Sequence, residues 1–266
     1  MTGADSVRRI FQIRRQVFFG ALGLVLVVSI GSAMVTQFDL VEGLASFPKA
    51  FGWMATNFVP NDRAWANLPK ILLRLGETVM VSIMATTAAA AASFLLAILG
   101  SRTTRFHPAA TLVVRTIASL ARNIPVVAWA MIFLLAFGQT FLTGFLALFI
   151  ESMGFLTRSY LETIDETASG PVEALKSAGV PWGPVVAHAV VPSVLPSLTS
   201  WMLFMLETNI RSATLVGLLT GTGIGFLFDL YYKSLNYPSA GLTTLAIEVA
   251  VVALEAASNA LRRVIL

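Results

Sequence analysis

Hydrophobic residues are gathered along this chain in long blocks that short polar segments separate. Each block is about twenty residues long, which is the length a helix needs to cross the hydrocarbon core of a bilayer. The pattern predicts an all-α, polytopic membrane protein with six transmembrane helices. The expected spans are residues 17–36, 77–100, 109–137, 141–158, the stretch after Pro192, and 240–261.

Charged residues between the blocks indicate the orientation of the spans. The tail of residues 1–16 is rich in arginine, and Arg262 and Arg263 follow the last span. Because cytoplasmic flanks are enriched in Lys and Arg, both termini are expected in the cytoplasm. Parity then gives the sides of the loops, with 162–187 inside and 37–70 and 229–239 outside.

The first apolar block is long for the core of a signal peptide, so it is interpreted as an uncleaved span. The chain is accordingly divided into two regions. Residues 1–70 are expected to form an N-terminal tail, the first span and an external loop that is partly helical. Residues 71–266 are expected to form the membrane core.

Composition excludes several classes of protein. The chain is 56% hydrophobic and 12% charged, whereas soluble proteins are about 45–50% apolar and 25% charged. The net charge of +4 comes from basic residues scattered between apolar runs, so no nucleic-acid surface is expected. Without cysteine there is no disulfide or thiolate site, and the isolated His107 and His188 predict no metal centre. No cofactor is expected.

A polar interruption between the fourth and fifth spans has the signals of a short helix. Gly170 is suited to the N-cap, Pro171 to the first helical position, and Gly179 to a left-handed stop. The predicted helix, residues 171–178, has about two turns and is too short to be stable alone in water. We therefore expect it to dock against another protein. Glu173 in its first turn is expected either to stabilise the positive helix end or to pair with a basic residue across that interface.

The same stretch resembles the cytoplasmic coupling loop of binding-protein-dependent ABC importer permeases. Their pattern is Glu-Ala-Ala, three residues, Gly, nine residues, and Ile-x-Leu-Pro. The chain departs from it conservatively at Leu175, Ala189 and Val191. The resemblance implies a coupling role for Glu173, Ala174, Leu175, Gly179 and Pro192.

This resemblance implies a type I ABC importer permease (MetI-like) fold in the bacterial cytoplasmic (inner) membrane. It also implies the partners: two copies of an ABC ATPase subunit, an extracytoplasmic substrate-binding protein, and a second copy of the chain. The chain itself has no Gly-x-x-x-x-Gly-Lys-Ser/Thr phosphate loop, so ATP hydrolysis is expected on a partner. It is interpreted as a transport subunit without catalytic residues.

Two shorter strings resemble the phosphonate-type permeases. They are Arg122-Asn-Ile-Pro125 and the run from Glu207 through Thr-Asn209-Ile to Arg211. This resemblance implies uptake of an oxyanion, with phosphonate, phosphate and phosphite left open. A permease for another small solute such as methionine is the alternative, and a secondary transporter is a more distant one. A membrane enzyme is disfavoured because neither His-Glu-x-x-His nor Gly-x-Ser-x-Gly is found.

Arginine within a span costs about 2.5 to 3.5 kcal/mol on insertion scales, so it is expected to face a partner, a cavity or an anion. Arg211 either pairs with Glu207, four residues earlier, or lines a path for the solute. Arg122 has no acidic residue at helical spacing and either lines the path or snorkels to the surface. The candidate path residues are Arg122, Asn123, Glu207, Asn209, Arg211 and Gly223.

Two further segments have simple structural interpretations. The glycine run from Gly221 to Gly225 lacks the βαβ context of a dinucleotide site, and it predicts irregular backbone buried in protein or lining the path. The carboxylates Glu162, Asp165 and Glu166 precede the short helix, and we expect them to form a solvated face rather than an acid/base site.

Overall fold

The computed structural model describes residues 3–105 and 107–265, and all regular secondary structure within them is helical, which confirms the all-α prediction. Five described helices are long and apolar enough to span a membrane, and a bent pair makes a sixth candidate. The helices are α1 Gly3–Val35, α2 Leu40–Asn57, α3 Asp62–Trp65, α4 Leu68–Gly100, α5 Pro108–Asn123, α6 Val126–Phe137, α7 Phe141–Thr167, α8 Ser169–Ser177, α9 Trp182–Val185, the π-helical turn η1 Val186–Val190, α10 Val191–Thr220, α11 Gly223–Lys233 and α12 Tyr237–Ile265.

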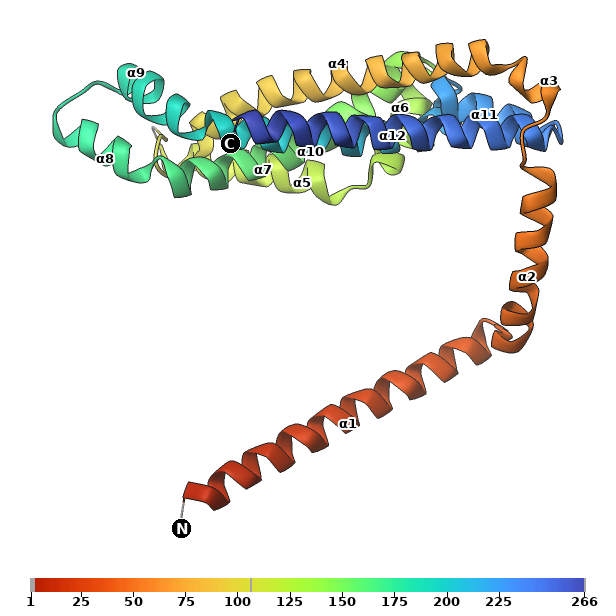
Figure 1. Ribbon diagram of the computed structural model, residues 1–266. Helices are drawn as coiled ribbons and strands as arrows, with labels where there is room; N and C mark the ends of the chain where they lie inside the picture. The colour runs from red at the N-terminus through yellow and green to blue at the C-terminus, as the bar shows by residue number, and fades with distance from the viewer. Residues whose placement is uncertain (1–2, 106, 266) are drawn as a thin grey trace. The chain divides into compact units, whose positions relative to one another are not determined.

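The chain divides into two compact units, Met1–Thr56 and Asn57–Leu266. The first unit consists of α1 and α2 (Figure 1). Within α1, the stretch Phe11–Val35 is apolar enough to cross a membrane, so the candidate span begins earlier than the predicted residue 17. Helix α2 fills much of the predicted external loop, which is therefore more helical than expected.

The second unit is built on the pair α4 and α7. Small side chains recur every four residues along α4 and form one buried stripe. This stripe lets the backbone of α7 approach closely, which is the favoured way for helices to associate in lipid, where both partners are equally apolar. The stripe consists of Ala85, Ala89, Ser93 and Ala97.

Hydrogen bonds between helices reinforce this packing. Asn209 on α10 is fully buried and donates to Thr86 Oγ1 at 2.8 Å and to Ser152 Oγ at 2.7 Å. Thr157 on α7 donates to Ser93 Oγ at 3.1 Å. A polar group in hydrocarbon has no water to bond, so these contacts hold α4, α7 and α10 in one register.

The predicted third span, residues 109–137, is broken in the structure. Helix α5 ends at Asn123, and α6 starts at Val126 after a bend of 91°. The cause is Pro125, which has no N–H to continue the ladder and which disfavours helical backbone at Ile124 before it. Ile124 is extended, with φ −95° and ψ 120°.

Close backbone approach fixes where α5 crosses α7. A Cβ at Gly154, near the middle of α7, would lie 2.6 Å from the backbone N of Arg122 and 2.8 Å from Ala121 Cβ. Only glycine fits this crossing. The bend therefore lies beside the mid-length of α7, and the last turn of α5 is held there.

The predicted irregular glycine segment is a tight junction between two helices. Helix α10 ends at Thr220, Gly221 is left-handed with φ +68°, and α11 begins at Gly223. Gly223 and Gly225 are buried, and the N–H of Ile224 donates to Thr78 Oγ1 at 2.9 Å. The backbone here is satisfied by protein, as irregular backbone at membrane depth requires.

The ends of the second unit differ. Figure 1 shows α8 and α9 at one end of the helix bundle and α3 at the other. Helix α7 continues to Thr167, well beyond the predicted residue 158, and leads almost directly into α8. Helix α12 runs from Tyr237 to Ile265, so it is longer at both ends than the predicted span 240–261.

Candidate functional site

The short helix α8 covers Ser169–Ser177, one or two residues earlier than predicted. The N-cap is Ala168 and not Gly170, because α7 and α8 are separated by a single residue that leaves no room for a separate cap. The stop is where the sequence predicted it: Gly179 has φ +76°, and the N–H of Val180 donates to the carbonyl of Leu175 at 3.1 Å. Left-handed backbone of this kind favours glycine.

One face of α8 is attached to the bundle and the other is free. Val172 is buried and Leu175 packs against the same apolar cluster, whereas Glu173 and Ala174 are exposed. Pro192 lies at the start of α10 and is also exposed. The segment therefore presents its polar residues outward while two apolar side chains anchor it.

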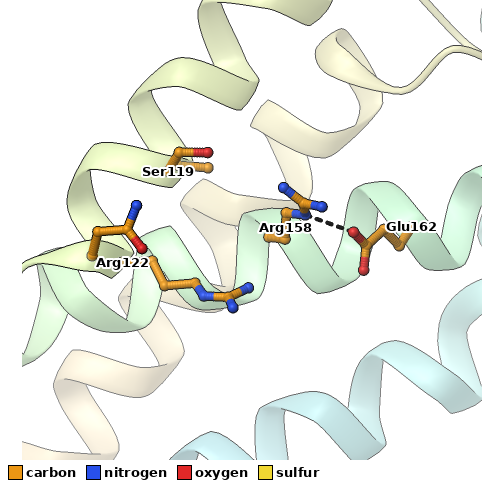
Figure 2. A pocket seen from close by; sticks show the side chains of 6 residues that line it. Ser119, Arg122, Arg158 and Glu162 are labelled. Carbon is orange, nitrogen blue, oxygen red and sulfur yellow. Dashed lines mark hydrogen bonds and ion pairs between the residues drawn. The ribbon is translucent and has the colours of Figure 1, made fainter. Parts of the chain in front are cut away.

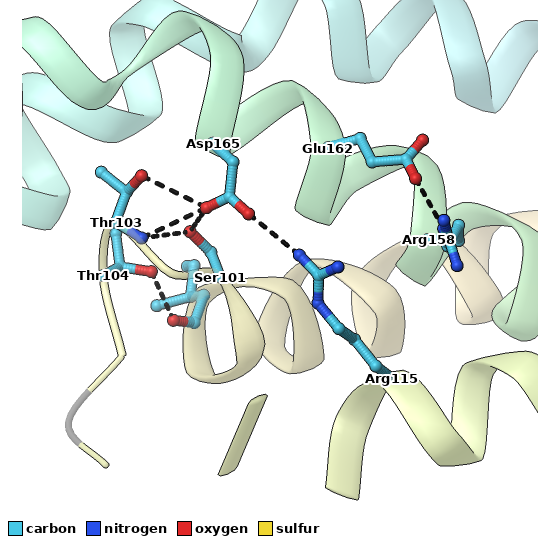
Figure 3. A network of polar contacts seen from close by, with 8 residues as sticks. Ser101, Thr103, Thr104, Arg115, Arg158, Glu162 and Asp165 are labelled. Carbon is cyan, nitrogen blue, oxygen red and sulfur yellow. Dashed lines mark hydrogen bonds and ion pairs between the residues drawn. The ribbon is translucent and has the colours of Figure 1, made fainter. Parts of the chain in front are cut away.

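A polar network joins the end of α7, just before this segment, to the loop between α4 and α5 and to α5 (Figure 3). Asp165 at the end of α7 accepts from Ser101 Oγ at 2.6 Å and from the N–H and Oγ1 of Thr103 at 3.2 Å each. Its other oxygen pairs with Arg115 of α5 at 3.1 Å. The prediction of a solvated carboxylate face is thus wrong for Asp165, because its partners come from a distant loop and helix. Glu162 and Glu166 are exposed as predicted.

Two further bonds tie the same loop to the coupling segment. Lys176 of α8 donates to the carbonyl of Thr103 at 2.8 Å, and Trp182 of α9 donates through Nε1 to the carbonyl of Thr104 at 2.7 Å. The loop therefore connects α8 and α9 with α5. Sequence reasoning missed this connection, since the partners lie more than seventy residues apart.

A polar pocket of about 350 Å³ lies farther along the bundle, between α5 and α7. Figure 2 shows Ser119 and Arg122 on α5 together with Arg158 and Glu162 on α7. Arg158 pairs with Glu162, Nε to Oε1, at 2.6 Å. The predicted path residues Arg122 and Asn123 line the pocket, and Arg158, Ser119 and Glu162 are added by the structure.

The remaining predicted path residues lie elsewhere. Glu207 pairs with Arg262 of α12 at 2.7 Å, so of the two alternatives for Arg211 the pair with Glu207 is not formed, and Arg211 is exposed. Asn209 faces the protein interior, where it bonds to α4 and α7. Gly223 is buried in the α10–α11 junction. The structure thus brings Arg122 and Asn123 together but places the other four on α10, its junction, or its contact with α12.

A comparison with protein-family models decides the class. Residues 91–265, about two thirds of the chain, match the model of the binding-protein-dependent transport system inner membrane component. The chain belongs to this family. It is therefore a multi-pass inner-membrane permease component of an ABC transporter and a non-catalytic subunit, which confirms the class implied by the coupling motif.

Relatives of known name are permease proteins named for the transport of phosphorus oxyanions. The permease is 35% identical over 190 residues to the phosphate-import permease protein PhnE of Mycolicibacterium smegmatis, matching 71% of this chain but 36% of that protein. It is 29% identical over 241 residues to the phosphite transport system permease protein PtxC of Stutzerimonas stutzeri, matching 91% of this chain and 86% of that protein. The chain thus spans about a third of the mycobacterial relative and most of the phosphite one.

Solved structures confirm the fold. The permease of the MetNI methionine ABC transporter, in an inward-facing crystal form, superimposes with a TM-score of 0.63 at 17% identity, covering 78% of this chain and 100% of that one. An amino acid ABC transporter crystallised with histidines gives a TM-score of 0.63 at 15% identity, covering 74% and 95%. The predicted MetI-like fold is correct. Among the residues that the structure describes, no group of three metal-ligating side chains is found.

Proposed function

We propose that the permease forms the membrane path for uptake of a phosphorus oxyanion, driven by ATP hydrolysis on a separate subunit. The observation that carries this proposal is Arg122, which lines the pocket between α5 and α7 and has no hydrogen-bond or ion-pair partner among the described residues, in a chain whose relatives are named for phosphate, phosphite and phosphonate. A guanidinium within a membrane protein is expected to face a partner, a cavity or an anion, so a pocket arginine with no acidic partner among the described residues supports an anionic solute.

In this proposal two copies of the chain form the path, with two ATPase subunits on the cytoplasmic side and a binding protein outside. Both termini are cytoplasmic. Cysteines introduced at Ser177 and Ser46 are then expected to react with a membrane-impermeant reagent from opposite sides. Reaction of both from one side would contradict the proposed orientation.

Helix α8 is the proposed contact with the ATPase. Its exposed Glu173 and Ala174 and the left-handed turn at Gly179 support this role. Gly179→Val has open space for its side chain but a backbone conformation that β-branched residues avoid, so it is expected to distort the turn and weaken co-purification of the ATPase. Gly183→Val, also in open space and with ordinary backbone, is the matched control.

The direct test is uptake by the reconstituted complex. Proteoliposomes that contain the permease, its ATPase and its binding protein should accumulate radiolabelled phosphate, phosphite or methylphosphonate only when ATP is present. Uptake of methionine in place of all three would overturn the oxyanion assignment. Uptake driven by an ion gradient without ATP would overturn the coupling mechanism.

A further inference from the structure

The pocket between α5 and α7 holds far more hydrogen-bond donors than its own acceptors use. Its polar lining consists of Ser119, Arg122, Asn123, Arg158 and Glu162. Within the described residues the one hydrogen bond or ion pair that these side chains make is Arg158 Nε to Glu162 Oε1. The remaining donors are free to bind a ligand that supplies oxygen acceptors.

Arg122 is held in place without using its donors. Its guanidinium carbon lies 6.0 Å from the centroid of the Phe155 ring on α7. The ring attracts the cation but offers its N–H groups no oxygen or nitrogen acceptor. The contact therefore helps to position Arg122, and its planar fork, which matches oxyanion geometry, has no acceptor among the described residues.

Arg158 is oriented in a complementary way. Glu162, one helical turn farther along α7, accepts from Nε and leaves the two terminal nitrogens free. The backbone beneath both arginines is also fixed, since the crossing at Gly154 sets the position of the last turn of α5. Two pre-oriented guanidinium groups thus share one cavity.

The charge balance of the pocket favours an anion without trapping it. Two arginines and one glutamate leave a net charge of +1 among the residues that line it. Its volume of about 350 Å³ equals the liquid volume of on the order of ten waters. A small tetrahedral anion therefore fits with part of its hydration shell, which moderates affinity as a transport site requires.

We propose that this pocket binds the transported oxyanion in passage, with Arg122, Arg158, Ser119 and Asn123 as donors and Glu162 as the group that orients Arg158. The inference rests on the proposed function and adds a specific binding site to it. The two halves of the site come from α5 and α7. The break between α5 and α6 ends α5 beside the pocket, so that Arg122 and Asn123 in its last turn line it.

A phosphoryl group could reach the pocket from two sources, namely a free anion or the headgroup of an anionic lipid. The shared chemistry is a tetrahedral phosphorus centre with unesterified oxygens. We assign the pocket to the free anion because the relatives of this permease are named for phosphate and phosphite, which are free oxyanions. The lipid composition of the assay separates the two sources.

The test is phosphate uptake by the reconstituted complex in vesicles of phosphatidylcholine alone and in vesicles with added phosphatidylglycerol. Arg122→Gln is expected to lower uptake about tenfold, the size of one charge-assisted hydrogen bond, in both lipids. ATP hydrolysis stimulated by the binding protein should stay within about twofold of wild type, since the ATPase contact is remote. Arg122→Lys keeps the charge and should restore part of the uptake, and Ser119→Ala should give a smaller loss.

The matched control is Arg263→Gln, which removes an exposed arginine outside the pocket and should change nothing. Uptake at the wild-type rate in Arg122→Gln and Arg158→Gln complexes would overturn the site while leaving the proposed function intact. An effect seen only with phosphatidylglycerol would assign the pocket to lipid and overturn it equally. A wild-type complex that imports no oxyanion would overturn the proposed function itself, so the two failures are distinguishable.

Discussion

Two arginines on the same helix, seven residues apart, have opposite surroundings. Arg115 lies near the α4–α5 loop and pairs with Asp165, which in turn holds Ser101 and Thr103 (Figure 3). Arg122 lies two turns farther along α5 and has no hydrogen-bond partner within the described residues (Figure 2). The difference teaches that Arg115 stabilises the structure, whereas the donors of Arg122 remain available for the anion that we propose.

The two regions are linked by α5 itself. Near its middle, at Arg115, the helix is tied through Asp165 and the α4–α5 loop to Lys176 of α8 and Trp182 of α9. At its C-terminal end it carries Arg122 and stops at the bend. A displacement of α8 would therefore act through polar contacts on the middle of α5, and α5 leads from there to the pocket.

The largest expected effect comes from forcing α5 away from α7, because this would break both the Arg115–Asp165 pair and the pocket around Arg122. Gly154→Ala places a Cβ 2.6 Å from the backbone N of Arg122, and backbone cannot yield. We expect the free energy of unfolding to fall by about 3 kcal/mol, at the upper end for overpacking. Thermal unfolding in detergent measures it. Gly76→Ala, where the added Cβ meets nothing, is the control, and equal melting temperatures for the two variants would contradict the crossing.

The next largest effect is expected from breaking the polar network of Asp165 alone. Asp165→Ala removes the acceptor of Ser101, Thr103 and Arg115 at once. Because the ion pair is partly exposed, with 28% and 20% of the side-chain surfaces accessible, we expect destabilisation of only about 2 kcal/mol.

The neighbouring carboxylate provides the control for that change. Glu166→Ala removes an exposed carboxylate one residue away and should shift stability by less than about 0.5 kcal/mol. Asp165→Asn keeps an oxygen acceptor for the loop and should lie between the two. A melting temperature for Asp165→Ala equal to that of Glu166→Ala would show that the network contributes nothing.

A smaller effect distinguishes the two arginines directly. Arg115→Gln is expected to cost about 1 kcal/mol of stability because it breaks a partly buried pair. Arg122→Gln should cost no more than about 0.5 kcal/mol, since it breaks no hydrogen bond in the described chain and removes only an exposed contact with the Phe155 ring at 6.0 Å, the outer limit for such contacts. Melting temperatures of the two variants, measured in one detergent, make the comparison. The reverse order of stabilities would contradict the division between structural and ligand-binding arginine.

Much of the fold could be predicted from local patterns. Apolar blocks gave the spans, and Gly179 gave the end of α8, because both depend on residues near one another in sequence. The bend after α5 was not predicted. The apolar run continues from α5 into α6, so hydropathy alone indicates one straight span. Pro125 was the signal that could have revealed the bend.

Long-range pairing could not be predicted. Glu207 has Arg211 at ideal helical spacing, yet it pairs with Arg262, fifty-five residues away, because α12 brings a second guanidinium to the same place. Asn209 was expected to line the path, but its position on α10 turns it toward Thr86 and Ser152. Arg158 and Ser119 joined the pocket for the same reason, since only the crossing of α5 and α7 unites them.

The smallest structural effect, and the sharpest for the pocket, is expected from Glu162→Gln. The change removes one exposed i,i+4 ion pair, which contributes about 0.3–0.5 kcal/mol, so folding should barely respond. It raises the net charge of the pocket lining from +1 to +2 and frees Arg158. An anion should then be held more tightly and released more slowly, so that KM and kcat for phosphate uptake both fall, each by about twofold for a change of this energy. Initial uptake rates over a range of phosphate concentrations measure both constants. Glu166→Gln is the control, since it removes the same charge from an exposed position outside the pocket. A rise in KM, or constants equal to those of the control, would show that the anion does not meet this pocket on its way through the membrane.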